Sequence, residues 1–433
     1  MRIKLIAFGC SNNQAESEIM AGLLKEAGYE IVDAKADLTI VSMCNVKGPS
    51  FNKGLRAAKD AKGKVIISGC IPFSQIAKIS KEIPRASIVS THNICSIKNA
   101  VERLAKGERV ELVGKKHSEN LLSEAKGDFE RKRENVCMPR IRKNKVIGIV
   151  PISSGCMGEC SYCAVKAIKG ELASYPVESI VKETEQCVKE GCKEIWLTAQ
   201  DTGCYGTDIG KSLPELLNAV LTVPGDFKVR LGMANPNFVY GCVDEMVGIY
   251  KNPKMFRFMH IPVQSGSDNV LKKMNRHYTC AQFVEIVGKL RKAIPDITIS
   301  TDIIVGFPEE SDADFNESLD VIEKTKPSVL NLNRYWPMPE TKAALMKQFR
   351  SEVLRERCSI MLKAFQRMAL DEKKKAVGKE LMVLIDDKVK GDSYIGRTDC
   401  YTPVGVKGKL VLGQMVRVKI VKATSNYLNG EKM

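Results

Sequence analysis

The beginning of the chain alternates short apolar runs with stretches whose apolar residues recur every three or four positions. Four runs rich in β-branched residues, KLIAFGC, LTIVSMC, KVIISGC and ASIVS, are separated by helical patterns that include 16–27 and 53–61. Strands and helices that alternate in this way build a parallel sheet with helices on its faces. We therefore predict a three-layer α/β domain over residues 1–113.

A second alternation runs from residue 146 to about residue 332 and contains six strand candidates: IGIVPIS, EIWLTAQD, KVRLGMA, MFRFMHIPV, ITISTDIIVGF and VLNLNRY. Six strands in one unit predict an open or partial (β/α)6 barrel. A helix over about 349–376 then leads out of it, because apolar residues recur there at one-turn spacing. Its predicted buried face comprises Leu354, Cys358, Met361, Phe365 and Met368. We place this second domain at 146–371.

The end of the chain shows a different pattern, in which short alternating strands are separated by glycines (ELMVLIDD, SYIGRT, VGVKGKLVLG, MVRVKIVKA). This pattern predicts a small antiparallel β-barrel of the oligonucleotide-binding type over 372–433. Between the first two domains, residues 115–145 hold ten bases against five acids. We interpret 114–145 as a basic linker.

Charge narrows the range of partners. The 433 residues include 67 Lys and Arg against 51 Asp and Glu, a formal charge of +16 that is typical of polyanion binding, so nucleic acid is the first partner to consider. No apolar run approaches the roughly 18 residues of a membrane span, and no signal peptide precedes the first strand. Fifteen cysteines without a secretory signal indicate a reducing cytoplasm, where clustered thiols bind metal or do redox chemistry.

The strongest chemical motif is Cys156-Met-Gly-Glu-Cys160-Ser-Tyr-Cys163, directly after a strand and before a helix. Three thiolates can hold three corners of an iron-sulfur cluster, and a 4Fe-4S cluster wants four cysteine ligands. The open iron can then chelate an amine and a carboxylate, which S-adenosylmethionine offers. The alternative is a zinc knuckle, which would recruit Cys187 or Cys192 from a helical pattern.

A second set of thiols is distributed. Cys10, Cys44 and Cys70 each end a separate strand candidate of the first domain. The carboxyl ends of parallel strands share one edge of a sheet, so three loops would deliver three thiols to one place. Taken singly, each cysteine is better explained as a small buried core residue than as a ligand. Because three of them stand at equivalent strand ends, we predict a second cluster with three cysteine ligands.

With these motifs in place, the chain resembles the radical S-adenosylmethionine superfamily and, within it, the methylthiotransferases. The C-terminal barrel is similar to their TRAM domain, and the wording of several motifs is most similar to the archaeal and eukaryotic-type branch, which acts on N6-threonylcarbamoyladenosine(37) beside the tRNA anticodon. The motifs are GCSNNQAESE, SGC, LTAQDTGCYG, RLGMANP, HIPVQSGSDNVLKKMNR, STDIIVGFPEES and GRTDCYTPV.

The resemblance implies two 4Fe-4S clusters, with Cys156, Cys160 and Cys163 as the catalytic set that cleaves S-adenosylmethionine, and the first-domain cluster as the site of sulfur insertion. It also implies a tRNA anticodon loop as substrate and an electron donor such as ferredoxin or flavodoxin. The cofactor cavity is expected to be lined by Gln200, Asp201, Gln264, Ser265, Asp302 and Gly306. Strand-end residues such as Gln200 and Asp201 are as often helix caps, and the turn at Gly306 could be only a turn.

This chain departs from the family pattern in three places. Lys169, Glu171 and Ala173 stand where relatives carry arginines, Ser42 replaces an asparagine, and the segment 335–341 reads YWPMPET without the usual Arg and Gly. Competing functions are methylthiolation of N6-isopentenyladenosine in tRNA or of a ribosomal protein, and a non-enzymatic iron-sulfur protein that binds RNA. Cleavage of S-adenosylmethionine by the reduced protein separates the enzymes from the last of these.

Overall fold

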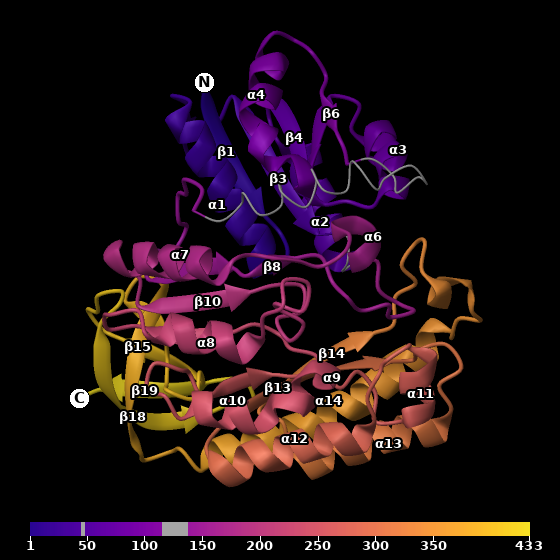
Figure 1. Ribbon diagram of the computed structural model, residues 1–433, viewed down its shortest axis with the longest axis vertical. Helices are drawn as coiled ribbons and strands as arrows, with labels where there is room; N and C mark the ends of the chain where they lie inside the picture. The colour runs from indigo at the N-terminus through magenta and orange to yellow at the C-terminus, as the bar shows by residue number, and fades with distance from the viewer. Residues whose placement is uncertain (45–47, 115–136) are drawn as a thin grey trace.

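The computed structural model describes residues 1–44, 48–114 and 137–433. In Figure 1 the first domain lies above a barrel of parallel strands, and the C-terminal strands form a smaller barrel at one end of that larger one. No helix of the described residues is both long and apolar enough to cross a membrane.

The first domain is a parallel six-stranded sheet with the order β2-β1-β3-β4-β5-β6. Its strands are β1 (Arg2–Ala7), β2 (Glu30–Ile31), β3 (Leu38–Cys44), β4 (Lys64–Cys70), β5 (Ala86–Ser90) and β6 (Glu111–Leu112). Its helices are α1 (Ser11–Glu26), α2 (Gly48–Asp60), α3 (Phe73–Glu82), the 3-10 turn η1 (Thr91–Ser96) and α4 (Ile97–Ala105). The sequence pattern did not predict the two-residue strands β2 and β6, because strands this short show no alternation of apolar and polar residues.

Both faces of this sheet are covered, which makes three layers as predicted. On one face Ile19 of α1 and Val101 of α4 pack against Ile40 and Ile66. On the other face, Leu55 of α2 and Ile79 of α3 pack in one cluster with Val41 of β3 and Ile67 of β4. Continuous burial along β3 and β4 is what a sheet covered on both faces requires.

The second domain contains six parallel strands in two three-stranded sheets, β11-β10-β7 and β12-β13-β14, and a bridge from Val229 to Met255 joins them. The predicted partial (β/α)6 barrel is confirmed. Its strands are β7 (Ile147–Pro151), β10 (Glu194–Thr198), β11 (Lys228–Leu231), β12 (Phe258–His260), β13 (Thr298–Val305) and β14 (Val329–Arg334). After β7, the short strands β8 (Ser153–Ser154) and β9 (Ala173–Ser174) form an antiparallel pair in which each strand has two residues.

Helices cover the outside of this barrel, and α14 carries the chain to the last domain (Figure 1). They are α6 (Val165–Lys169), α7 (Val177–Lys189), α8 (Leu213–Leu221), α9 (Pro236–Val239), η2 (Tyr240–Cys242), α10 (Val243–Tyr250), α11 (Asp268–Lys273), α12 (Cys280–Ala293), α13 (Asp312–Thr325), η3 (Lys342–Leu345) and α14 (Ser351–Lys374). Met361 and Phe365 are buried on α14, on the face that the apolar spacing predicts.

The last domain is a closed five-stranded barrel with the order β15-β16-β17-β19-β18. Its strands are β15 (Glu380–Lys390), β16 (Ser393–Arg397), β17 (Pro403–Lys407), β18 (Met415–Ala423) and β19 (Leu428–Lys432). The expected small barrel is confirmed with one correction, because β17 and β19 pair in parallel and the other four pairs are antiparallel. Closure removes the exposed edges that an open sheet of this size would leave.

Two bases of the predicted basic linker are not available for RNA. Arg140 contacts Glu183 with 3.0 Å between Nε and Oε1, and both side chains are buried. Arg142 binds Glu190 over 2.7 Å. These two bases are therefore paired with acids, Glu183 of α7 and Glu190 directly after it. The predicted linker residues 115–136 lie outside the described residues.

The small barrel packs against the amino-terminal ends of the large barrel's strands. Arg230 of β11 lies over the rings of Trp196, Phe258 and Tyr401, with its guanidinium carbon 5.2–5.6 Å from the three centroids. Beneath these rings the carboxyl of Glu194 is buried and accepts a hydrogen bond from Trp196 Nε1 over 2.9 Å. The large barrel thus ends on an aromatic and charged interface.

This interface should respond to pH through Glu194. Burial, together with the nearby charge of Asp386, raises the pKa of Glu194 from 4.5 to about 7. The folded state therefore favours the neutral acid, and its stability falls as the pH rises through about 7. We expect the thermal unfolding midpoint of the full chain to be higher at pH about 6 than at about 8, and Glu194→Gln to flatten that difference. The exposed control Glu431→Gln should leave it unchanged; an equal slope in both variants would contradict the assignment.

Candidate functional site

The three cysteines of the CxxxCxxC motif lie in a loop that the β8–β9 hairpin closes at its base. Within the loop, Cys163 N donates to Cys160 O over 3.1 Å and Cys156 N donates to Gly170 O over 3.3 Å. A side-chain carbon placed at Gly158 would lie 3.4 Å from Cys156 Sγ and 3.6 Å from Cys160 Sγ. These two sulfurs therefore face the same small volume.

Each sulfur of this set accepts one N–H donor. Gly158 N donates to Cys156 Sγ over 3.2 Å, Val165 N to Cys163 Sγ over 3.4 Å, and Arg276 Nη1 to Cys160 Sγ over 3.2 Å. Burial and the charge of Asp201 raise the pKa of Cys156 to about 11, and burial and the charge of Cys160 raise that of Cys163 to about 12. Iron bound here would displace the thiol protons, since the thiolate is the metal ligand.

Arg276 connects this loop to the strand ends of the barrel. Its other terminal nitrogen donates to Asn235 Oδ1, and Asn235 donates to Asp201 through its backbone N (3.1 Å) and its Nδ2 (2.5 Å). Sequence reasoning assigned no role to Arg276 or Asn235, although both lie in quoted motifs, KKMNR and GMANP. The signal was present as a motif, but neither residue's partner can be read from its neighbours in the chain.

Gln200 and Asp201, the predicted cofactor residues that follow β10, differ in whether their side-chain oxygens already accept hydrogen bonds within the protein. Asp201 is fully buried, and Gly203 N and Asn235 already donate to its oxygens, so it fixes the loop whatever else it binds. The side-chain oxygen of Gln200 is buried and accepts no hydrogen bond from the described residues. A buried acceptor of that kind requires a donor, and an amine or ribose hydroxyl of S-adenosylmethionine would satisfy it.

Gln264 and Ser265 form a rigid turn above β13. Gln264 has a positive φ of 69°, and its backbone pairs with Asp302 O and Ile304 N over 2.8 and 2.9 Å. Ser265 Oγ contacts Ser318 Oγ and accepts from Ser267 N. These contacts give both residues fixed positions in the barrel. That they line the cofactor cavity stays a prediction.

Asp302 belongs to a polar group that spans three adjacent strands. Its Oδ1 lies 2.8 Å from His260 Nε2 and accepts from Asn331 Nδ2 over 2.6 Å. His260 and Asn331 are further residues that sequence reasoning missed. They come together because β12, β13 and β14 are neighbours in the sheet, and no local spacing reveals that order.

Gly306 has a packing role that the sequence does not show. Its φ is +72°, and a side-chain carbon there would lie 1.9 Å from Leu354 Cδ2 of α14. Glycine is therefore required by the approach of α14. Its expected role beside adenosine remains a prediction.

The distributed cysteines of the first domain meet as expected at the carboxyl edge of the sheet. Cys44 and Cys70 are directly paired on β3 and β4, and Cys10 precedes α1. Asn13 lies between them: it accepts from Cys10 Sγ over 3.3 Å, and its Nδ2 lies 3.8 Å from Cys70 Sγ. A hydrogen bond with Cys44 and burial raise the pKa of Cys70 well above its ordinary value.

The two cysteine sets meet across α6, a proximity that the sequence did not predict. Ala164, which directly follows Cys163, and Ile168 pack together with Cys44 and Cys70 in one buried cluster. Met338, from the segment that departs from the family pattern, completes that cluster. In Figure 1, α6 accordingly lies at the junction of the first domain and the barrel.

The chemistry of these donors fits iron-sulfur clusters better than zinc. Among residues 1–44, 48–114 and 137–433, no three His, Cys, Asp or Glu side chains are arranged to hold one metal ion. A cluster spreads its cysteine ligands over separate irons, whereas zinc gathers four ligands around one ion. The proposed zinc-knuckle partners Cys187 and Cys192 instead hydrogen-bond to each other.

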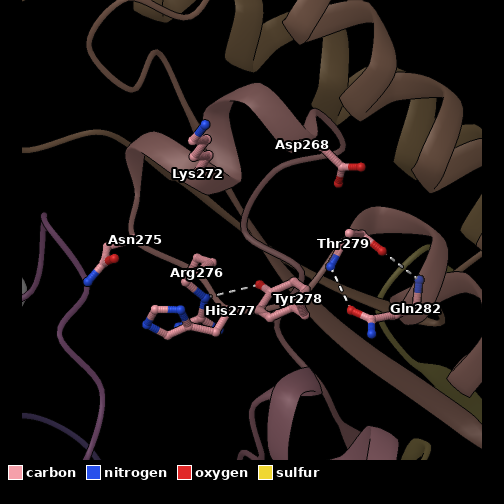
Figure 2. A pocket seen from close by; sticks show the side chains of 8 residues that line it. All are labelled: Asp268, Lys272, Asn275, Arg276, His277, Tyr278, Thr279 and Gln282. Carbon is pink, nitrogen blue, oxygen red and sulfur yellow. Dashed lines mark hydrogen bonds between the residues drawn. The ribbon is translucent and has the colours of Figure 1, made fainter.

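A pocket of about 430 Å³ lies at the turn between α11 and α12, and Figure 2 shows Arg276 beside Tyr278 within it. The lining residues are Asp268, Lys272, Asn275, Arg276, His277, Tyr278, Thr279 and Gln282. Arg276 Nε donates to the Tyr278 hydroxyl over 3.1 Å. The lining includes none of the predicted cofactor residues, so this pocket is separate from the expected cofactor cavity, although Arg276 links it to Cys160.

Comparison with known proteins agrees with this architecture. The Radical SAM superfamily model matches residues 150–322, the TRAM domain model residues 374–433, and the model of the uncharacterized protein family UPF0004 residues 2–91. The solved radical S-adenosylmethionine methyltransferase TsrM from Kitasatospora setae shares the fold with a TM-score of 0.57 at 13% identity, over 85% of this chain and 89% of that chain. Fold and cysteine loop together define a radical S-adenosylmethionine protein.

Full-length relatives define the family more narrowly. A probable threonylcarbamoyladenosine tRNA methylthiotransferase of Pyrococcus abyssi (strain GE5 / Orsay) is 38% identical over 100% of both chains. The threonylcarbamoyladenosine tRNA methylthiotransferase of Homo sapiens is 36% identical over 99% of this chain and 74% of its own. The chain belongs to the threonylcarbamoyladenosine tRNA methylthiotransferase family, which confirms the resemblance that the motifs indicated.

The packing role of Gly306 can be tested by adding one carbon. We expect Gly306→Ala to lower the free energy of unfolding by roughly 2–4 kcal/mol, because a left-handed backbone and an overfilled contact both oppose the new side chain. Leu354→Ala should make room, so the double variant should lose less than the sum of the two single variants. Denaturant unfolding measures this; normal stability combined with lost binding of S-adenosylmethionine would indicate that the glycine serves the cofactor alone.

Proposed function

We propose that this protein is a tRNA methylthiotransferase that places a methylthio group on C2 of N6-threonylcarbamoyladenosine beside the anticodon. One observation carries the proposal: in a chain of this family, α6, which begins two residues after Cys163 of one cysteine set, packs on Cys44 and Cys70 of the other. A catalytic cluster alone would need one set. Two adjacent sets suit a reaction that both activates a carbon and delivers sulfur to it.

Cys156, Cys160 and Cys163 would hold a 4Fe-4S cluster with S-adenosylmethionine on its open iron, and Cys10, Cys44 and Cys70 would hold the cluster from which sulfur is taken. When bound, these groups supply the radical chemistry that an aromatic C–H bond requires and that ordinary side chains cannot perform. A second S-adenosylmethionine is the methyl source that the family implies.

The chain's own residues hold and orient these groups. Arg276 donates to Cys160 and, through Asn235, is connected to Asp201, so hydrogen bonds link the cysteine loop to the strand ends. The buried oxygen of Gln200, which lacks a donor among the described residues, would accept a hydrogen bond from the cofactor. Asn13 separates Cys10 from Cys70 and orients both sulfurs.

The proposed substrate and partners follow from the position of the modified adenine in tRNA and from the charge of the C-terminal barrel. An adenine inside an anticodon loop must be turned out of its stack to enter a site between domains. The C-terminal barrel, with ten bases against six acids over 379–433, would bind tRNA phosphates. A ferredoxin or flavodoxin would deliver electrons. None of the fifteen cysteines, all of which lie in the described residues, forms a disulfide, which suits a reducing cytoplasm.

The direct test is nucleoside mass spectrometry of tRNA from cells that lack this protein. The methylthiolated form of N6-threonylcarbamoyladenosine should disappear while the unmethylthiolated nucleoside accumulates, and the wild-type gene should restore it. Unchanged nucleosides would contradict the proposed reaction.

The two cysteine sets should be independent and should differ in chemistry. Anaerobically reconstituted protein should hold about eight irons, four for each of two 4Fe-4S clusters, and replacement of either triple by Ala should leave about four. Loss of Cys156, Cys160 and Cys163 should abolish 5′-deoxyadenosine formation, because that set faces the barrel. Loss of Cys10, Cys44 and Cys70 should spare it and stop sulfur insertion.

The matched control replaces Cys95, Cys242 and Cys280 by Ala, three cysteines outside both sets, and should keep about eight irons. Two outcomes would contradict this assignment. One is iron near zero with either triple in protein that stays folded. The other is methylthiolated RNA made by the Cys10, Cys44 and Cys70 variant.

The terminal barrel should contribute salt-dependent tRNA binding. Arg417, Lys419 and Lys422 are exposed on β18. Their replacement by Ala should weaken binding and reduce the slope of log affinity against log salt by roughly two units. The reason is that fewer counterions are released on binding when fewer phosphates are contacted. Exposed Lys81, Lys98 and Lys106, on or next to the helices α3 and α4 of the first domain, supply a control triple of equal charge. Equal slopes in both triples would remove β18 from the RNA contact.

A further inference from the structure

Lys169 enters the first domain from the second. It is the last residue of α6, and its side chain is almost fully buried at 2% exposure. Its ammonium group donates to Glu16 Oε1 of α1 and to Thr91 Oγ1. Glu16 Oε1 also accepts from Thr91 Oγ1 over 2.7 Å and from Asn12 Nδ2 over 3.1 Å. A lysine of the barrel domain is therefore buried against α1 of the other domain, next to Ile168, which packs on Cys44 and Cys70.

The ammonium keeps its charge there. Its partner is the carboxylate of Glu16, and this ion pair holds the positive charge of Lys169 in a buried position. Lys169 lies on the helix whose Ile168 packs on Cys44 and Cys70, and its partner Glu16 lies on α1, the helix that follows Cys10. The buried positive charge and the first cysteine set are thus neighbours in the fold.

Stability alone does not explain this charge. A buried ion pair contributes little net stability relative to apolar residues of the same volume, because both charges lose their hydration. Ala164 and Ile168 of the same helix already supply apolar contact with Cys44 and Cys70. Lys169 adds a positive charge to a junction that its neighbours already pack.

We propose that Lys169 is a positioning residue for the first-domain cluster: its buried charge, balanced by Glu16, favours cluster binding by Cys10, Cys44 and Cys70 and raises the reduction potential of that cluster. This inference rests on the proposed function in that it requires a cluster at this site. Reduction adds one negative charge, and a fixed positive charge in a poorly solvated site stabilises the reduced form.

The test uses the full chain with Cys156, Cys160 and Cys163 replaced by Ala, so that iron binds only to the first set. The midpoint potential of the reconstituted cluster is measured by redox titration followed by electron paramagnetic resonance. We expect Lys169→Met to shift the midpoint to more negative values or to lose iron, and Lys169→Arg to stay near the parent. Lys166→Met is the matched control, because Lys166 lies on the same helix but pairs with Glu159 and Glu171, and it should change nothing.

A second variant separates charge from packing. Glu16→Gln removes the balancing negative charge and should shift the midpoint in the positive direction, whereas a packing defect would move both variants in the same direction. The double variant Lys169→Met with Glu16→Gln should return toward the parent. If iron-loaded Lys169→Met and Glu16→Gln show unchanged midpoints, or midpoints shifted in the same direction, the proposed role of Lys169 is wrong. That result would leave the proposed function in place. A parent that binds no iron would contradict the proposed function at this site and this inference with it.

Discussion

The contact of α6 with the carboxyl edge of the first sheet is the constraint on which the arrangement of the molecule depends. This five-residue helix begins two residues after Cys163, packs Ile168 on Cys44 and Cys70, and buries Lys169 against Glu16. His92 Nε2 and Ile168 O, 2.6 Å apart, form a further link. Neither cysteine set could shift relative to the other without breaking contacts that are buried on both sides.

The opposite end of the large barrel is also tied down, and by different chemistry. There Arg230 lies among aromatic rings of both barrels, and Asn144 Nδ2 donates to Asp386 O over 2.7 Å. Because the small barrel is held at the amino-terminal ends of the strands, it lies at the end opposite to the cysteine loop. An RNA that contacts both must therefore be large, which suits a folded tRNA better than a short peptide loop.

Polar networks of the large barrel share one feature: each joins residues from separate elements of secondary structure or loops. The group of Asp302, His260 and Asn331 spans three strands, and Arg276 joins the α11–α12 turn to the cysteine loop. Side chains that are linked by several hydrogen bonds restrain one another's positions. The fold therefore holds these side chains in place before any cofactor or substrate arrives.

The sequence by itself determined the three folding units, the partial barrel and both cysteine sets, because these depend on local periodicity and on cysteines placed at strand ends. It also indicated the family, through motifs whose residues are adjacent in the chain. The tertiary structure alone decided that Arg276 serves Cys160, that Gly306 makes room for Leu354, that Arg140 and Arg142 are paired, and that the two cysteine sets meet across α6. Lys169 and Glu16 are 153 residues apart, and Arg276 and Cys160 are 116 apart. Such partners are brought together by tertiary packing, within the large barrel for Arg276 and Cys160 and between two domains for Lys169 and Glu16, and no pattern within either segment records that packing.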